Sequence, residues 1–450
     1  MNLAGSIEGK GWANGFGAGG VFWLCLAAIL GMSLPNLIDP MIRYDDYPAL
    51  FAEGDLFWEK TLNEGRWVNY IWHLREIVTP AWLNFAIYQA FWALFAASLT
   101  TVVVRQKGLT FFKGTLALLI LVSPSALLIS LWFNTLLPGL GLVAIFGLLA
   151  CRVSSRTLNL LLPIFVVATF MAYTTYPLLL LAIILFRQES RSFPKLIGLL
   201  ALFSISFIVA ILLTYTINWS VHGIFGVPLA EWREATPAHN LSQLRDNLPK
   251  LLETFNAFMT KSSFGFYPAQ IFHIALMIGA SLVLLRHEPL EALYIYAGLI
   301  TGITLIVLQV LKLGVAIPAR TLIFVWVFYA ITVVRAAEIL STKHAFAGRM
   351  ACNAALLIVG SFLLQSYKQM NQYRDWQVET RQISQQIEGV EGTVSVKGQP
   401  MLLASAVRGG IQSDVAFQFR MQQLVGRDVV LCAATDTLCK DSAVLTFPDN

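Results

Sequence analysis

Long apolar runs constrain the fold of this 450-residue sequence more than any other feature. A helix needs about 20 apolar residues to cross the hydrocarbon core of a bilayer. We count about 11 runs that approach this length, at residues 21–38, 81–104, 114–133, 135–151, 157–173, 174–186, 196–217, 268–285, 291–311, 321–341 and 350–367. A mean hydropathy of +0.66 with only 13% charged residues excludes a soluble protein. The sequence therefore predicts an all-α polytopic membrane protein.

Basic residues in the connections between these runs predict the orientation. Loops on the cytoplasmic side of a membrane are enriched in Lys and Arg. A cytoplasmic N-terminus places the following residues on that side: Arg105, Lys107, Lys113, Arg152, Arg156, Arg187, Arg191, Lys195, Arg286, Lys343 and Arg349. The opposite side, the periplasm of a bacterium, then receives a first loop (residues 39–80), a second loop (residues 218–267), residues 312–320 and the tail. The net charge of +5 thus reflects topology in the inner (plasma) membrane, not nucleic-acid binding.

One part of this prediction is less regular. The runs at 157–173 and 174–186 are short and are separated by the Tyr173–Pro177 segment YTTYP, so they form two spans, a re-entrant hairpin or one kinked helix. We keep two spans, because the later basic residues then fall on the cytoplasmic side. The membrane domain comprises residues 1–367.

Residues 368–450 are polar and predict a small α/β periplasmic domain. Trp376, Ile383, Ile387 and Val390 have helical spacing, and residues 429–433 and 443–447 have the character of strands. Cys25, Cys151 and Cys352 lie in or near apolar runs and are expected to pack there. In an oxidising compartment, Cys432 and Cys439 are candidates for a disulfide.

The first loop contains the strongest candidate for chemistry. It concentrates carboxylates, arginines and tryptophans beside the membrane, including the adjacent pair Asp45 and Asp46. From Trp67 onward, apolar and polar residues alternate with helical periodicity, which predicts an amphipathic helix lying along membrane lipids. The expected substrate contacts are Arg43, Arg66, Trp67, His73, Arg75, Glu76, Lys312 and Arg320.

A carboxylate and a few cations outside a membrane suit one reaction class. A sugar carried on a polyprenyl phosphate already has a good leaving group, so the protein must supply a base for the acceptor hydroxyl and cations for the released phosphate. We favour Asp45 as the base, with Asp46 in a supporting contact. An acidic pair in a solvated loop is the plainer alternative, and basic residues near a span can also snorkel to the interface. The sequence contains no zinc, P-loop or serine-hydrolase motif, and we expect neither metal nor cofactor.

Four short motifs carry a family resemblance: RYDDY at 43–47, GRW at 65–67, IPAR at 317–320 and NQYRDW at 371–376. With the layout of spans and external tail, they resemble membrane glycosyltransferases of the GT-C fold, more narrowly the serotype-converting O-antigen glucosyltransferases (Gtr type). The resemblance implies transfer of glucose from undecaprenyl phosphate to a sugar of lipid-linked O-antigen in the periplasm. It also implies Asp45 or Asp46 as base, Arg320 at the donor phosphate, no metal, and two partners: a small flippase and a glucosyltransferase that synthesises the donor.

The second loop departs from this pattern, because its carboxylates Glu231, Glu234 and Asp246 are scattered and leave a second catalytic carboxylate unassigned. Two alternatives remain. A transporter or flippase of lipid-linked glycans is disfavoured by the near absence of charges within the spans and of a repeat. An O-antigen polymerase or ligase has the same compartment and the same class of substrate, and the sequence does not separate it from the monosaccharide transferase.

Overall fold

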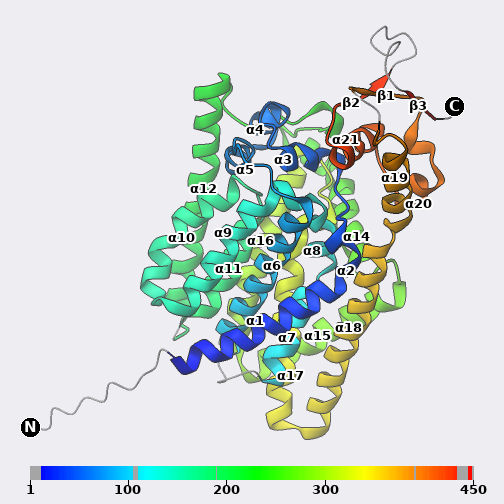
Figure 1. The fold of residues 1–450 in the computed structure, drawn as a ribbon. Helices are drawn as coiled ribbons and strands as arrows, with labels where there is room; N and C mark the ends of the chain where they lie inside the picture. The colour runs from blue at the N-terminus through cyan, green and yellow to red at the C-terminus, as the bar shows by residue number, and fades with distance from the viewer. Residues whose placement is uncertain (1–11, 105–109, 189, 390–391, 433–443, 448–450) are drawn as a thin grey trace, which may run out of the picture.

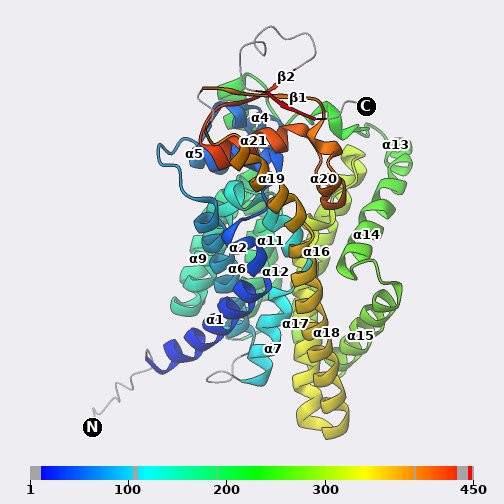
Figure 2. The ribbon, with the colours of Figure 1, turned by 45° about the vertical axis from the view of Figure 1, so that its right-hand side comes forward.

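Helices form most of the molecule, and a small parallel sheet lies at one end (Figures 1 and 2). The computed structural model describes residues 12–104, 110–188, 190–389, 392–432 and 444–447. Within these residues, seven helical segments are long and apolar enough to cross a membrane. They are α6 (Ala81–Val103), α8 to α9 (Pro124–Arg152), α12 (Phe193–His222), α15 (Tyr267–His287), α16 (Pro289–Leu313), α17 with its preceding turn (Ala319–Lys343), and α18 (Ala345–Asn371) with α19. The chain is therefore a multi-pass membrane protein.

Four further helices are apolar but short: α1 (Trp12–Met32), whose apolar part begins at Gly19, α7 (Phe111–Leu121), α10 (Ser155–Phe170) and α11 (Tyr176–Arg187). Together with the long segments they account for every apolar run found in the sequence. The figure of about 11 transmembrane helices stays a prediction, because these four are shorter than a full span.

One predicted boundary is wrong. The expected span at 114–133 divides near its middle, since α7 ends at Leu121 and a new helix starts at Pro124. Ser123 accepts a hydrogen bond from the Ala126 amide, and proline fits the first helical turn because it has no N–H to satisfy. The break expected within residues 173–177 is present, because α10 ends at Phe170 and α11 begins at Tyr176.

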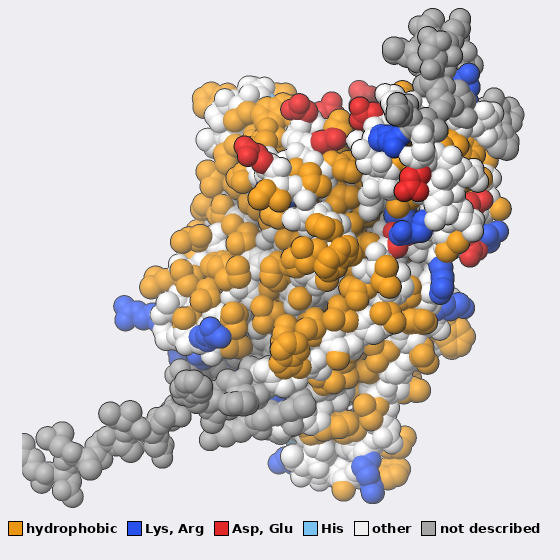
Figure 3. All heavy atoms as spheres, in the orientation of Figure 1, with side chains coloured by type: hydrophobic (Ala, Val, Ile, Leu, Met, Phe, Trp, Pro, Cys, Tyr) orange, Lys and Arg blue, Asp and Glu red, His pale blue; other side chains and the backbone are white. Residues whose placement is uncertain are grey.

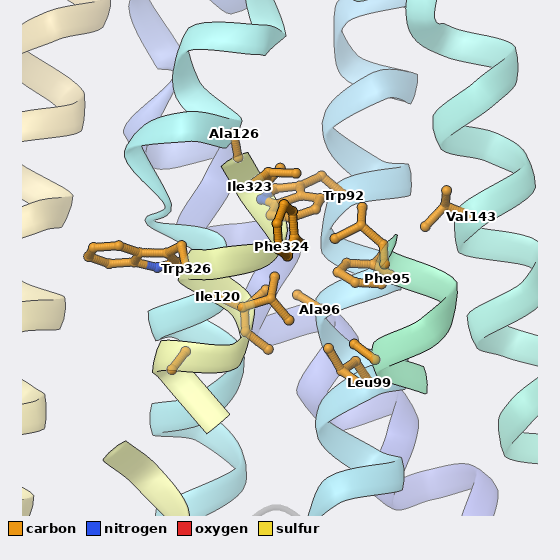
Figure 4. Close-up of a cluster of buried hydrophobic side chains, with 14 of the residues drawn as sticks. Trp92, Phe95, Ala96, Leu99, Ile120, Ala126, Val143, Ile323, Phe324 and Trp326 are labelled. Carbon is orange, nitrogen blue, oxygen red and sulfur yellow. The ribbon is translucent and has the colours of Figure 1, made fainter. Parts of the chain in front are cut away.

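Close packing holds the bundle together. Every residue of α11 from Tyr176 to Phe186 is buried, and Figure 4 shows Trp92 and Phe95 of α6 beside Phe324 of α17. Gly298 of α16 faces α17, and a Cβ atom there would lie 2.6 Å from the Phe328 ring. Since lipid tails are as apolar as leucine, such close approach at small residues drives helix association in membranes.

The first and second loops lie at the end of the bundle that carries the sheet, here called the cap side (Figure 1). The first loop contains η1 (Tyr44–Asp46), α3 (Tyr47–Phe51), η2 (Asp55–Phe57), α4 (Trp58–Glu64) and α5 (Trp67–His73), and it follows α2 (Leu34–Ile38). The second loop contains η4 (Glu231–Arg233), α13 (Leu241–Asp246) and α14 (Leu248–Ser262). Only the first part of the predicted amphipathic stretch from Trp67 to Val78 is helical, because α5 ends at His73. Ile71 is 68% exposed, whereas His73, expected on the polar face, is fully buried.

Charged side chains are distributed unevenly along the molecule. On the face shown in Figure 3, Asp and Glu lie towards the cap side, while the opposite end shows Lys and Arg without Asp or Glu. A broad apolar band separates the two ends. This distribution is the one expected of a protein that spans a bilayer.

The described residues after α18, here called the cap (372–447), form the sheet and its helices. The helical elements are α19 (Arg374–Gln386), η6 (Pro400–Leu402), α20 (Ala404–Gly409) and α21 (Asp414–Val425). The sheet has the order β2-β1-β3 and is parallel throughout, with β1 at Val394–Lys397, β2 at Val429–Cys432 and β3 at Val444–Thr446. Both strands expected from the sequence are present, and β1 was not predicted. Val390 and Cys439 lie outside the described residues, and Cys25, Cys151 and Cys352 are free.

The cap is attached to the start of the first loop. Arg420 donates to Asp39 at 2.7 Å, and Arg381 lies 2.9 Å from the same carboxylate. These contacts hold the pKa of Asp39 below its usual value, although burial opposes them. Met41 and Leu131 complete the apolar core of the cap. The cap therefore rests directly on residues that adjoin Asp45 and Trp132.

Replacing Arg420 by Met should loosen the cap. We expect the free energy of unfolding of the cap to fall by about 3 kcal/mol, because breaking a buried ion pair leaves the remaining charge uncompensated. Arg408→Met is the matched control, since Arg408 and Asp375 form a pair that is 61% and 64% exposed and such pairs contribute at most about 1 kcal/mol. Amide hydrogen exchange of α19 measures the difference, and equal protection in both variants would contradict this role of Arg420.

Candidate active site at the first loop

Asp46 is adjacent to Asp45 in η1, but its side chain points into the protein. It is fully buried. Its Oδ2 accepts hydrogen bonds from the Asn134 amide at 3.0 Å and from Asn134 Nδ2 at 2.9 Å, and its Oδ1 accepts from the Thr135 amide at 2.7 Å. These amides lie in the first turn of α9 (Phe133–Arg152), where no carbonyl of the helix itself can accept them. Asp46 thus caps α9 from a distant part of the chain.

The ionisation of Asp46 reflects two opposing influences. Burial raises its pKa to about 7, and the neighbouring Asp45 charge acts in the same direction, while the hydrogen bonds from Thr135 and Asn134 oppose the rise. With no exposed surface and both oxygens occupied, Asp46 has a structural role.

Asp45 has a different environment. Its side chain is 30% exposed. Oδ1 accepts a hydrogen bond from the Trp132 indole at 2.7 Å, and Oδ2 lies 3.3 Å from Lys60 Nζ. Burial raises its pKa, but the Lys60 charge and the two hydrogen bonds outweigh this effect and leave the pKa below its usual value. Asp45 is therefore an ionised carboxylate with an accessible surface at neutral pH.

Trp132 also gathers two guanidinium groups beside Asp45. Arg43 Cζ lies 5.3 Å and Arg320 Cζ 4.3 Å from the centre of a Trp132 ring, within range for cation–π contact. Among the described residues, neither arginine has a carboxylate within ion-pair distance. Arginine without an anionic partner is suited to binding phosphate. We call Asp45, Lys60, Trp132, Arg43 and Arg320 the Asp45 site.

The GRW motif at residues 65–67 lies where the first loop contacts the second loop. Arg66 pairs with Glu64 at 2.6 Å, and Arg233 of the second loop pairs with the same carboxylate at 3.2 Å. Trp67 donates its indole N–H to Asn218 at 2.8 Å. The Arg66 charge also helps to lower the pKa of Asp45, so Arg66 borders the site.

The other residues predicted to contact the substrate either make structural contacts or lie away from the Asp45 site. His73 is fully buried and stacks on Phe57 at 4.0 Å, and burial lowers its pKa to about 4, so it is neutral at pH 7. Arg75 donates to the Ala49 carbonyl at the end of α3.

Lys312 and Glu76 also differ from the expectation. Lys312 donates to the Ala238 carbonyl at 2.5 Å, which ties the end of α16 to the second loop. Glu76 is exposed beyond α5. The Asp45 site therefore includes Asp45, Arg43 and Arg320 of the predicted set.

Two members of the site were not predicted. Trp132 falls inside a run that the sequence patterns assign to a transmembrane span, and it is 87 residues from Asp45. Lys60 lies in the first loop, but nothing in its spacing distinguishes it from a solvated lysine. No group of three or more His, Cys, Asp or Glu residues that could hold a metal ion is present in the part of the chain that the structure describes. No known family model and no curated protein matches the sequence.

The different roles of the two aspartates predict different effects on stability. Asp46→Asn replaces one acceptor oxygen by an NH₂ group that faces an amide donor, so we expect a loss of about 1–2 kcal/mol, typical of a lost helix cap. Asp45→Asn should cost less, at most about 1 kcal/mol, because Asn keeps an acceptor oxygen for Trp132 and a partly exposed ion pair contributes little. Thermal unfolding of the purified variants in detergent measures both. Equal destabilisation would contradict the capping role of Asp46.

Proposed function

We propose that this protein is a membrane glycosyltransferase that moves glucose from undecaprenyl phosphate to a sugar of a lipid-linked O-antigen on the periplasmic side. The observation that carries the proposal is the Asp45 site, in which an ionised, accessible carboxylate shares one tryptophan with two arginines that lack carboxylate partners. This arrangement provides a base and an anion site side by side. The sequence resemblance to serotype-converting glucosyltransferases supports the donor and acceptor classes.

The chemistry follows from the two halves of the site. Asp45 takes the proton of the acceptor hydroxyl while the hydroxyl oxygen forms a bond to the anomeric carbon of the donor. The bond from that carbon to the phosphate oxygen breaks, and the electron pair leaves with the polyprenyl phosphate. Arg320 and Arg43 stabilise the negative charge that develops on the phosphate. The indole of Trp132 holds the carboxylate in place throughout.

The competing functions fit less well. A transport site usually places ionisable residues near the middle of the membrane. The buried ion pairs of Glu291 with Arg335 and Arg191 instead join the first turn of α16 to the second half of α17 and to the connection before α12. A polymerase or ligase would have the same base and phosphate site but transfer a longer glycan, so the size of the product distinguishes it. In the proposed pathway a small flippase and a donor-synthesising glucosyltransferase are the partners.

The central test is Asp45→Asn. Transfer from purified undecaprenyl-phosphate glucose to a lipid-linked acceptor should fall about 10²–10⁴-fold, the usual contribution of a general base. Asp55→Asn is the control, because Asp55 is an exposed carboxylate of the same loop and its loss should leave transfer unchanged. Full activity of Asp45→Asn would refute the assignment of the base.

A second test separates phosphate binding from catalysis. Arg320→Ala should raise the KM for the donor about 10- to 100-fold, because a hydrogen bond to a charged group contributes about 1.5–3 kcal/mol. Lys312→Ala should leave this KM unchanged, since Lys312 binds a backbone carbonyl. Steady-state kinetics with varied donor measures both variants, and an unchanged KM in Arg320→Ala would remove Arg320 from the phosphate site.

The pH dependence provides a third test. Lys60 lowers the pKa of Asp45, so Lys60→Met should raise that pKa. Because the base must be ionised, activity at acidic pH should fall, and the acidic limb of kcat/KM should move to higher pH. Lys250→Met is the control, since Lys250 pairs only with the exposed Glu253 in the described chain. An acidic limb that stays in place would show that Lys60 does not set the ionisation of the base.

A further inference from the structure

A pocket of about 280 Å³ lies between α14, α15, α16 and α17, outside the Asp45 site. Its lining includes Phe258, His273, Ile274, Met277, Trp326 and Tyr329. The volume is at the lower end of the range for small-molecule sites. It therefore suits part of a ligand, not a whole lipid.

The chemistry of the lining selects an apolar occupant. Five lining residues are polar, Ser262, Ser263, Gln270, His273 and Tyr329, and the last two hydrogen-bond to each other at 2.7 Å. Most of the rest is aliphatic, aromatic or thioether surface, and methionines such as Met259 and Met277 adapt to irregular chains. A sugar or phosphate would lose its hydration here with few partners in return.

The pocket opens towards the surroundings of the bundle. Ile274 and Ile278 on its rim are 49% and 57% exposed. Of the membrane-spanning stretch of α15, only 17% is buried inside the protein. In a multi-pass membrane protein this surface faces lipid, so a hydrocarbon chain can enter sideways from the bilayer.

Two connections link the pocket to the segment that carries Arg320, a member of the Asp45 site. Thr254 of α14 accepts a hydrogen bond from the Ile317 amide at 2.9 Å, and Phe258, one turn further along α14, lines the pocket. Arg320 lies in η5 (Ala319–Leu322), which runs directly into α17. Trp326 and Tyr329 follow Arg320 by six and nine residues, roughly 10–15 Å along the helix. Figure 2 shows α14 descending from α13 to α15 on this side of the bundle.

We propose that this pocket holds a segment of the isoprenoid chain of the donor while the donor phosphate lies at Arg320. The inference rests on the proposed function. The donor chain is the proposed occupant because the pocket adjoins the helix that follows Arg320 and has room for a single chain segment. A bilayer phospholipid in the pocket would not require its phosphate to lie at Arg320. Occupation of the pocket would align the phosphate with Asp45 and select a membrane-bound donor over a soluble one.

Cross-linking tests the location directly. A polyprenyl phosphate with a photoreactive group in its chain near the phosphate should label peptides that contain residues 270–278 or 325–329 of the full-length protein. Excess unlabelled undecaprenyl phosphate should suppress this labelling, and excess phosphatidylglycerol should not. Labelling elsewhere, or equal suppression by phosphatidylglycerol, overturns the proposal.

Kinetics with two donors tests the function of the pocket. Met277→Trp fills the pocket, so the KM for the undecaprenyl donor should rise about tenfold, equivalent to 1.4 kcal/mol, with little change for a donor with a short isoprenoid chain. Leu282→Trp, on an exposed position of the same helix, should leave both values unchanged. An equal rise for both donors overturns the proposal. Wild-type transfer without labelling of the pocket refutes the pocket alone, whereas absence of both transfer and labelling refutes the proposed function.

Discussion

The contact between Asp46 and the first turn of α9 is the interaction on which the rest of the site depends. A carboxylate buried without partners would be costly, and so would the free amides of a buried helix start. Each satisfies the other here, through Asn134 and Thr135. The contact joins the first loop to a membrane helix almost 90 residues away along the chain. Because η1 is held there, the neighbouring Asp45 points in a different direction and accepts a hydrogen bond from Trp132.

A separate set of contacts links the cap to the site. Met41 lies shortly before Asp45 and Leu131 immediately before Trp132, and both belong to the apolar core of the cap. The buried Arg420 and the half-exposed Arg381 hold Asp39 a few residues upstream. The cap therefore packs against the start of the first loop and holds it in place. Its contribution to the proposed reaction is to position Asp45 and Trp132, with no contact to the substrate required.

The two adjacent aspartates differ in environment and therefore in pKa. Burial raises the pKa of Asp46, while Lys60 and Trp132 lower that of Asp45. The carboxylate with a lowered pKa is the partly exposed one, as a base that operates in solution requires. The two arginines beside it lack carboxylate partners among the described residues, in contrast to Arg66, which Glu64 neutralises. Positive charge without a neighbouring carboxylate therefore lies beside Asp45 in the described part of the chain, as the proposed phosphate site requires.

The sequence by itself determined the class of the protein, because hydrophobicity over about 20 residues is a local property that a bilayer reads directly. It also located the acidic pair, Arg43 and Arg320, the start of α5 and two of the three strands. Only the tertiary structure distinguished Asp45 from Asp46, since their environments come from residues far away in the chain. For the same reason it alone revealed Trp132, which looks like part of a span, and removed His73 and Arg75 from the site. Local patterns report what a segment can become, while burial and partners depend on what packs against it.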